Sequence, residues 1–134
     1  MLSNTRLALA VAGTLVVASC GGGGTPTTPS TGSGGPVGIT ITGGRGTNAF
    51  TPNPANVTAG QQVTFKNNDS VTHHVILDDG SAQTADIAPG ATSGAISIGG
   101  NKSYHCTIHP GMVGGFNGSM GDPPPNCTGA YCGG

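Results

Sequence analysis

From Val37 onward the sequence is a series of short runs in which apolar residues occupy every second position. In the first run, VGITI, the apolar residues Val37, Ile39 and Ile41 share one parity. Later runs of this kind are QQVTFKN, VTHHVIL, GAISI, NKSYHC and a glycine-weakened MVGGFNGSM. Successive side chains of a β-strand point to opposite faces, so this alternation predicts strands with one buried face. No window shows the period of an amphipathic helix together with helix caps.

The segments between these runs have the composition of turns. They are TPNPANVTAG, NNDS, DDGSAQ, APGA and GGN, rich in Gly, Pro, Asn and Asp. Short strands at regular spacing, separated by such turns, are typical of a β-sandwich. We therefore predict an all-β fold, a small Greek-key β-sandwich, over residues 36–120. A domain of this size buries little apolar surface, and a bound metal would help to stabilise it.

The first twenty residues, MLSNTRLALAVAGTLVVASC, have the features of an export signal. Arg6 precedes an apolar run, Leu7 to Val17, that is shorter than the ~20 residues needed to span a bilayer. The run ends in VVASC, which resembles the lipobox of a bacterial lipoprotein. We expect a lipoprotein signal peptide at residues 1–19 and lipidation of Cys20. The alternative is an ordinary secretory signal whose cleavage site happens to include a cysteine.

Residues 20–35 form a segment of Gly, Thr, Pro and Ser without apolar periodicity, which predicts a flexible linker. Several acyl chains on Cys20 would give stable anchoring. We therefore expect an exported protein that is attached to a bacterial membrane and faces the periplasm or the cell exterior.

Charge and motif content exclude several classes of function. Lys and Arg number four against five acidic residues, and charged residues make up 7% of the chain. Nucleic acid needs clustered basic side chains, so it is not expected as a partner. No pair of catalytic carboxylates and no Ser/His/Asp order supports an enzyme. The glycine run at residues 21–24 follows no strand and precedes no helix, so it is not a phosphate-binding loop.

The segment YHCTIHPGM contains a thiol, an imidazole and a thioether at intervals of three residues. Cys106 ends a predicted strand, and His109 and Met112 follow in a loop that can turn all three side chains to one point. Thiolate and imidazole suit copper or zinc, whereas a thioether is a weak ligand for copper and a poor one for zinc. A structural thiol at Cys106 and core packing by Met112 are the alternatives. The three residues together favour copper.

A trigonal copper site needs a second imidazole, for which the candidates are His73, His74 and His105. His73 shares the parity of Val71 and of the apolar residues at 75 and 77, so it is expected to point inward. His105 has the opposite parity to Cys106 and should point away from the site. We assign the strong ligands to His73, Cys106 and His109, and the weak axial ligand to Met112.

Two segments, TPNPANVTAGQQVTFKNNDSVTHHVIL and YHCTIHPGMVGGF, resemble the signature regions of the cupredoxins, the type I blue-copper family of plastocyanin, pseudoazurin and azurin. The ligand loop, residues 106–112, is most similar to that of amicyanin. The resemblance as a whole covers residues 37–118. It implies one copper ion that alternates between Cu(I) and Cu(II), with His73 as the first histidine ligand. The family often has Asn after this histidine, where its side chain pins the ligand loop. Here that position is His74, which becomes the second-choice ligand.

The resemblance also implies a one-electron carrier whose electrons pass through the ring edge of the loop histidine. The corresponding apolar patch would consist of His109, Pro110, Gly111 and Val113. We expect a lipid-anchored monomer that carries electrons between membrane or periplasmic redox proteins. The alternatives are periplasmic copper handling, as a chaperone or store, and a metal-free structural cupredoxin. Copper stoichiometry distinguishes the first alternative, and the intact ligand set argues against the second.

The tail, residues 121–134, is rich in Gly and Pro and contains Cys127 and Cys132. In an exported chain two thiols this close are expected to form a local disulfide. The alternative is a second metal site, for Cu(I), with Met120 or a histidine as a further ligand. With the tail pair closed and Cys20 lipidated, Cys106 is left as the free thiol that a copper site requires.

Overall fold

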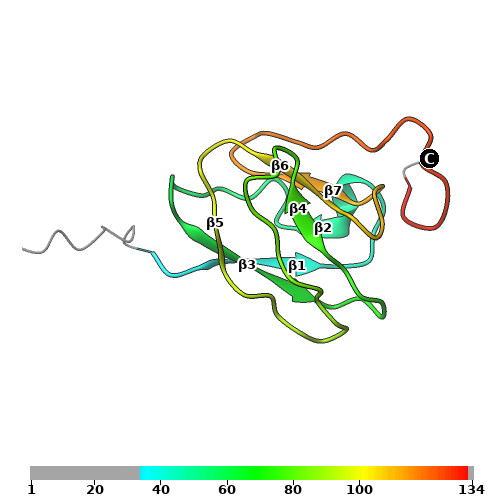
Figure 1. The fold of residues 1–134 in the computed structure, drawn as a ribbon, viewed down its shortest axis with the longest axis horizontal. Coiled ribbons are helices and arrows are strands. Elements are labelled where there is room, and N and C mark those ends of the chain that lie inside the picture. Colours follow the sequence, from blue (N-terminus) through cyan, green and yellow to red (C-terminus); the bar gives the residue numbers. More distant parts are fainter. Residues whose placement is uncertain (1–33, 133–134) are drawn as a thin grey trace, which may run out of the picture.

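The computed structural model describes residues 34–132, which form two β-sheets around one core (Figure 1). The predicted signal peptide (1–19), the predicted lipidation site Cys20 and most of the predicted linker (20–35) lie outside these residues. Within the described part of the chain, no helix has the length and apolar character needed to cross a membrane.

The strands are short, as the alternating runs predicted. They are β1 (Val37–Ile41), β2 (Phe50–Thr51), β3 (Gln62–Asn67), β4 (Val75–Leu77), β5 (Ile96–Ser97), β6 (Ser103–Cys106) and β7 (Val113–Gly115), with a 3₁₀ turn η1 (Thr47–Ala49) before β2. One sheet has the order β2-β1-β3-β5 and the other β4-β6-β7. β1 and β3 are parallel, and the other pairs are antiparallel. The predicted all-β sandwich is confirmed.

The alternation in the sequence places one face of each main strand in the core. Eight alternating residues on four strands are at most 1% exposed: Ile39, Ile41, Val63, Phe65, Val75, Leu77, Tyr104 and Cys106. Aromatic rings fill the centre, where Tyr104 lies 5.0 Å from Phe50, 5.4 Å from Phe65 and 5.0 Å from Phe116 between ring centroids. Burial of each side chain of this size contributes roughly 1.5–3 kcal/mol to the stability of the fold. β6 thus carries both a central core residue, Tyr104, and the predicted ligand Cys106.

The run VTHHVIL does not form one continuous strand, and the inward position predicted for Val71 is wrong. Val71 is 36% exposed. The side chain of Asn67 explains the difference, because its Nδ2 donates to the carbonyls of Val71 and Ile87, each at 2.8 Å. The chain bends around this buried amide. The inward face resumes at His73, which pairs with Ile87 in an isolated bridge, and β4 begins only at Val75.

A substitution in β7 tests the packing of the central aromatic ring. Gly114 pairs with Tyr104 across β6 and β7, and a Cβ at this position would overlap the Tyr104 ring. We expect Gly114→Ala to lower the free energy of unfolding by about 1–3 kcal/mol, measured by denaturant titration. Gly38 in β1 is the matched control, because a Cβ there has no neighbour within 4 Å. Equal effects of Gly38→Ala and Gly114→Ala would contradict the predicted contact.

Candidate metal centre

His73, Cys106 and His109 converge at one end of the sandwich. Cys106 is the last residue of β6, His109 lies in the loop between β6 and β7, and His73 lies in the turn before β4. One donor atom from each lies within 4.8 Å of the others. Cys106 Sγ is 3.5 Å from His73 Nδ1 and 3.8 Å from His109 Nδ1, and the two Nδ1 atoms are 3.2 Å apart. The structure therefore brings together the three residues predicted to be strong ligands.

The fourth predicted ligand, Met112, is fully buried in the same loop. Its backbone N–H donates to the carbonyl of His109 at 2.8 Å, and its carbonyl accepts from the N–H of Cys106 at 3.0 Å. These two backbone bonds close the loop on itself. The residues Cys106, His109 and Met112 consequently have little freedom to move relative to one another.

The donor set fits a single transition-metal ion. His73 Nε2 lies 3.0 Å from Asp69 Oδ2 and donates its proton there, which leaves the Nδ1 lone pair directed at Cys106 and His109. Three donors at metal–ligand distances of about 2.0–2.3 Å would lie about 3.5–3.8 Å apart in a trigonal arrangement, close to the separations observed. Cys106 is the free cysteine of residues 34–132. A thiolate with two imidazoles and a thioether in the same loop suits copper.

The protonation of the cluster is shaped by its surroundings. Burial, and then the neighbouring His73, lower the pKa of His109 below its usual value. The neutral ring that metal binding requires therefore persists to lower pH. The pKa of Asp69 is also lowered, because hydrogen bonds from Ser70, Tyr131 and His73 outweigh the opposing effect of burial. Asp69 is thus an anion that contacts His73 Nε2, the ring nitrogen on the side away from Cys106.

The other two histidines lie outside the cluster. The ring of His74, the second-choice ligand, contacts Asp86 at 3.0 Å and Gln83 at 3.3 Å. His105 contacts Asp78, as its opposite parity to Cys106 predicted. The backbone carbonyl of His74 nevertheless accepts the N–H of Thr107 at 2.8 Å. The ligand loop is thus tied to the segment that carries His73 by a backbone bond that needs no particular side chain at position 74.

Sequence reasoning missed the residues that support the ligands. Asn67 is fully buried, and besides its two bonds to backbone carbonyls its Oδ1 accepts the N–H of Asp69 at 2.9 Å. This network shapes the turn that carries Asp69 and His73. The turn composition of NNDS was visible in the sequence, and Asn and Asp in such segments commonly bond to the nearby backbone. Which backbone groups they reach was not visible.

The tail changes the surface predicted for electron transfer. Gly111 and Val113 were expected to form part of an apolar surface patch, but both are buried. A Cβ at Gly111 would overlap the backbone of Tyr131 and Cys132, and Gly121 lies against the side chain of Val113. The segment that follows β7 therefore packs over the ligand loop. His109 and Pro110 remain partly or largely exposed beside it.

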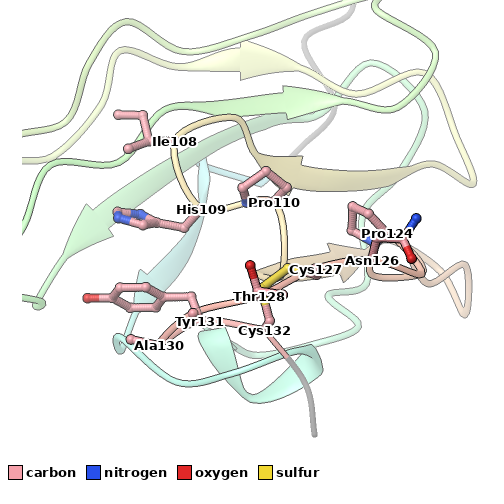
Figure 2. Close-up of a pocket in the computed structure, with 11 residues that line it drawn as sticks. Ile108, His109, Pro110, Pro124, Asn126, Cys127, Thr128, Ala130, Tyr131 and Cys132 are labelled. Atoms are coloured by element: carbon pink, nitrogen blue, oxygen red, sulfur yellow. A yellow bond between two sulfur atoms is a disulfide. The ribbon is translucent and has the colours of Figure 1, made fainter.

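A disulfide between Cys127 and Cys132 closes the end of this tail. A cavity of about 550 Å³ lies between the tail and the ligand loop, and Ile108, His109 and Pro110 line its loop side (Figure 2). The Tyr131 ring packs against the His109 ring, with centroids 4.2 Å apart. The tail is thus part of the surroundings of the metal centre.

Comparison with curated proteins finds two plant plastocyanins. The chain is 32% identical to plastocyanin of Cucumis sativus over 97 residues, which are 57% of this chain and 93% of the relative. It is 35% identical to plastocyanin of Mercurialis perennis over 82 residues, which are 49% of this chain and 83% of the relative. A scan against models of protein families finds no match.

Solved structures with a similar fold include two copper proteins. The Cu-containing nitrite reductase from Thermus scotoductus SA-01 matches with a TM-score of 0.50 and 25% identity over 60% of this chain, but this chain covers 21% of the enzyme. A mutant of amicyanin in its reduced Cu(I) form matches with a TM-score of 0.50 and 22% identity over 63% of this chain and 83% of amicyanin. The amicyanin match supports the fold alone.

A substitution of the buried amide tests the support of the site. Asn67→Ala would leave the carbonyl of Val71 and the N–H of Asp69 without a partner, and the carbonyl of Ile87 would keep only the N–H of His73. We expect a loss of about 2–4 kcal/mol in the free energy of unfolding, measured by denaturant titration, together with weaker copper binding. The neighbouring Asn68 is exposed and serves as the control. An Asn67→Ala protein as stable as Asn68→Ala would contradict the role given to the amide.

The fold, the donor set and the plastocyanin relatives agree with one another. The cupredoxin fold predicted from the two signature segments is confirmed, and so is copper as the cofactor. The chain belongs to the plastocyanin-like cupredoxins, a family of type I copper proteins.

Proposed function

We propose that the protein would hold one copper ion through His73, Cys106 and His109, with Met112 as a weaker fourth ligand, and that it acts as a one-electron carrier. The observation that carries the proposal is the convergence of one thiol and two imidazole nitrogens within 4.8 Å. Copper bound there supplies a one-electron couple between Cu(I) and Cu(II). The residues supply a fixed set of donors that suits both states.

The frame around the ligands supports rapid electron transfer. Cys106 pairs with Val75 across β6 and β4, and its N–H is bonded within the ligand loop. His73 is buried and held by Asp69. Ligands fixed in this way change little when the charge on the metal changes. The buried apolar residues nearby exclude water, which raises the reduction potential.

The exposed part of the ligand loop is the proposed site of electron entry and exit. Ile108 is 47% exposed and Pro110 is exposed, and both flank the half-buried His109. A small apolar surface of this kind suits brief encounters with redox proteins. The low charge of the chain argues against strong electrostatic steering.

We also propose that the carrier is exported, monomeric and anchored to a bacterial membrane by lipid on Cys20. Support comes from the lipobox-like VVASC, from the linker composition and from the tail disulfide, which suits an oxidising compartment. A tether would raise the local concentration of the carrier near membrane-bound redox proteins. The similarity to nitrite reductase involves about a fifth of that enzyme, and we propose a carrier rather than an enzyme.

Copper titration of the purified chain tests the proposed site. We expect an intense thiolate-to-copper absorption band that saturates at one equivalent of Cu(II) and is bleached by ascorbate. Cys106→Ser should abolish the band because it removes the thiolate, and His74→Ala should retain it. Weak d–d absorption alone would contradict the proposal. Saturation at two or more equivalents would favour copper storage or delivery instead.

The proposed surface is tested by electron self-exchange between the Cu(I) and Cu(II) forms, which requires no other protein. We expect Ile108→Asp to slow self-exchange, measured by NMR line broadening, by roughly tenfold, which corresponds to about 1.4 kcal/mol. Met120→Asp is the control. Met120 is 36% exposed and lies near Ser103 at the start of β6, at the opposite end of that strand from Cys106. Equal rates for the two variants would place the contact surface elsewhere.

A further inference from the structure

Tyr131, in the disulfide-closed tail, contacts both imidazole ligands proposed above. Its ring lies 4.2 Å from the His109 ring at an interplanar angle of 40°. It also meets the His73 ring edge-on, with centroids 6.0 Å apart and an interplanar angle of 84°. Figure 2 shows the side chains of His109 and Tyr131 extending in the same direction from the ligand loop and the tail.

The hydroxyl of Tyr131 reaches His73 through one carboxylate oxygen. Tyr131 Oη donates to Asp69 Oδ2 at 2.9 Å, and the same oxygen accepts from His73 Nε2 at 3.0 Å. Asp69 is held in place from the other side, because its Oδ1 accepts the N–H of Ser70 at 2.6 Å. Two donors therefore share the negative charge of Asp69 Oδ2.

The tail holds Tyr131 in this position. The Cys127–Cys132 disulfide closes the segment around it, and Cys132 is 9% exposed. The backbone of Tyr131 and Cys132 lies against Gly111, where there is no room for a Cβ. Both cysteines also line the cavity between the tail and the ligand loop (Figure 2). The tail thus meets the ligand loop through backbone contact and through the Tyr131 ring, and it meets Asp69 through the Tyr131 hydroxyl.

We propose that Tyr131 is a positioning residue of the metal centre, which orients His109 through its ring and adjusts His73 through Asp69. This inference rests on the proposed copper site and adds the tail to it. A carboxylate bonded to the far nitrogen of a histidine ligand makes that histidine a stronger donor. A stronger donor favours Cu(II) and lowers the reduction potential. The Tyr131 hydroxyl draws on the same carboxylate oxygen and opposes that effect.

The hydrogen-bonded series Tyr131, Asp69 and His73 is called the relay below. Removing the Asp69 carboxylate and removing the Tyr131 hydroxyl should therefore shift the reduction potential in opposite directions. In the copper-loaded full-length chain, Asp69→Asn removes the negative charge behind His73 and should raise the reduction potential. Tyr131→Phe removes the second hydrogen bond to Asp69 Oδ2, so His73 no longer shares that oxygen with another donor. His73 then becomes a stronger ligand, which should lower the reduction potential. In the double variant the effect of Tyr131→Phe should disappear, because the carboxylate through which it acts is gone. Shifts of the same sign, or shifts that simply add, would overturn the relay.

The ring and the hydroxyl are separated by a second measurement, the rate at which copper passes to a strong chelator. Tyr131→Phe keeps the ring and should release copper at nearly the rate of the unmodified chain. Tyr131→Leu removes the ring and should release copper about tenfold faster or more, the usual scale for residues that support ligands. Replacing Cys127 and Cys132 together by Ser should reproduce the effect of Tyr131→Leu. Equal rates of copper release from Tyr131→Leu and Tyr131→Phe would overturn the role proposed for the ring.

Two controls separate this inference from the copper site itself. Asn126 lines the same cavity from an exposed position, and Asn126→Ala should change neither the potential nor the release rate. In its metal-free form Tyr131→Phe should unfold nearly like the parent chain, because it keeps the ring that packs against the core. If the parent chain lacks the intense thiolate band, the copper site fails and the inference with it. If the band is present and every Tyr131 variant matches the parent, the inference fails while the carrier function stands.

Discussion

The pairing of β6 between β4 and β7 is the constraint on which the metal centre depends. Tyr104, two residues before the end of β6, occupies the middle of the aromatic core, and Cys106 is the last residue of the strand. Cys106 pairs with Val75 on one side, and His105 pairs with Val113 on the other. The position of the thiol is therefore set by strand register and core packing. A shift of β6 by one residue would turn Cys106 outward and expose Tyr104.

The histidines are placed by a different kind of interaction. His73 is fixed from behind by Asp69, which is fixed in turn by the buried amide of Asn67. His109 is fixed by a closed loop and by the Tyr131 ring. Strand β6 thus positions the cysteine, whereas polar side chains and the tail position the two histidines. A one-electron carrier benefits from this division, because ligands that are held from several sides change little between oxidation states.

Much of the fold and of the site could be predicted from the sequence, because β-strand periodicity is local. The parity of the apolar residues correctly placed Tyr104 and Cys106 inside and His105 outside. It failed at Val71, where a buried side-chain amide bends the chain and interrupts the strand. It also could not show that Gly111 and Val113 are covered, since the covering residues follow β7 and belong to the Gly- and Pro-rich tail. Composition describes such a segment as a loop and does not show what it touches.

The sequence by itself determined the donor types, the spacing of Cys106, His109 and Met112, and the all-β character of the domain. These depend on residue chemistry and on a period of two residues. Parity favoured His73, but only the tertiary structure excluded the second choice, His74, and showed that Asp69 bonds to His73 and that Tyr131 contacts both imidazoles. His73 and Cys106 are 33 residues apart, and Asp69 and Tyr131 are 62 residues apart. Contacts of that range arise when the sheets pack and the tail folds back, and no local pattern encodes them.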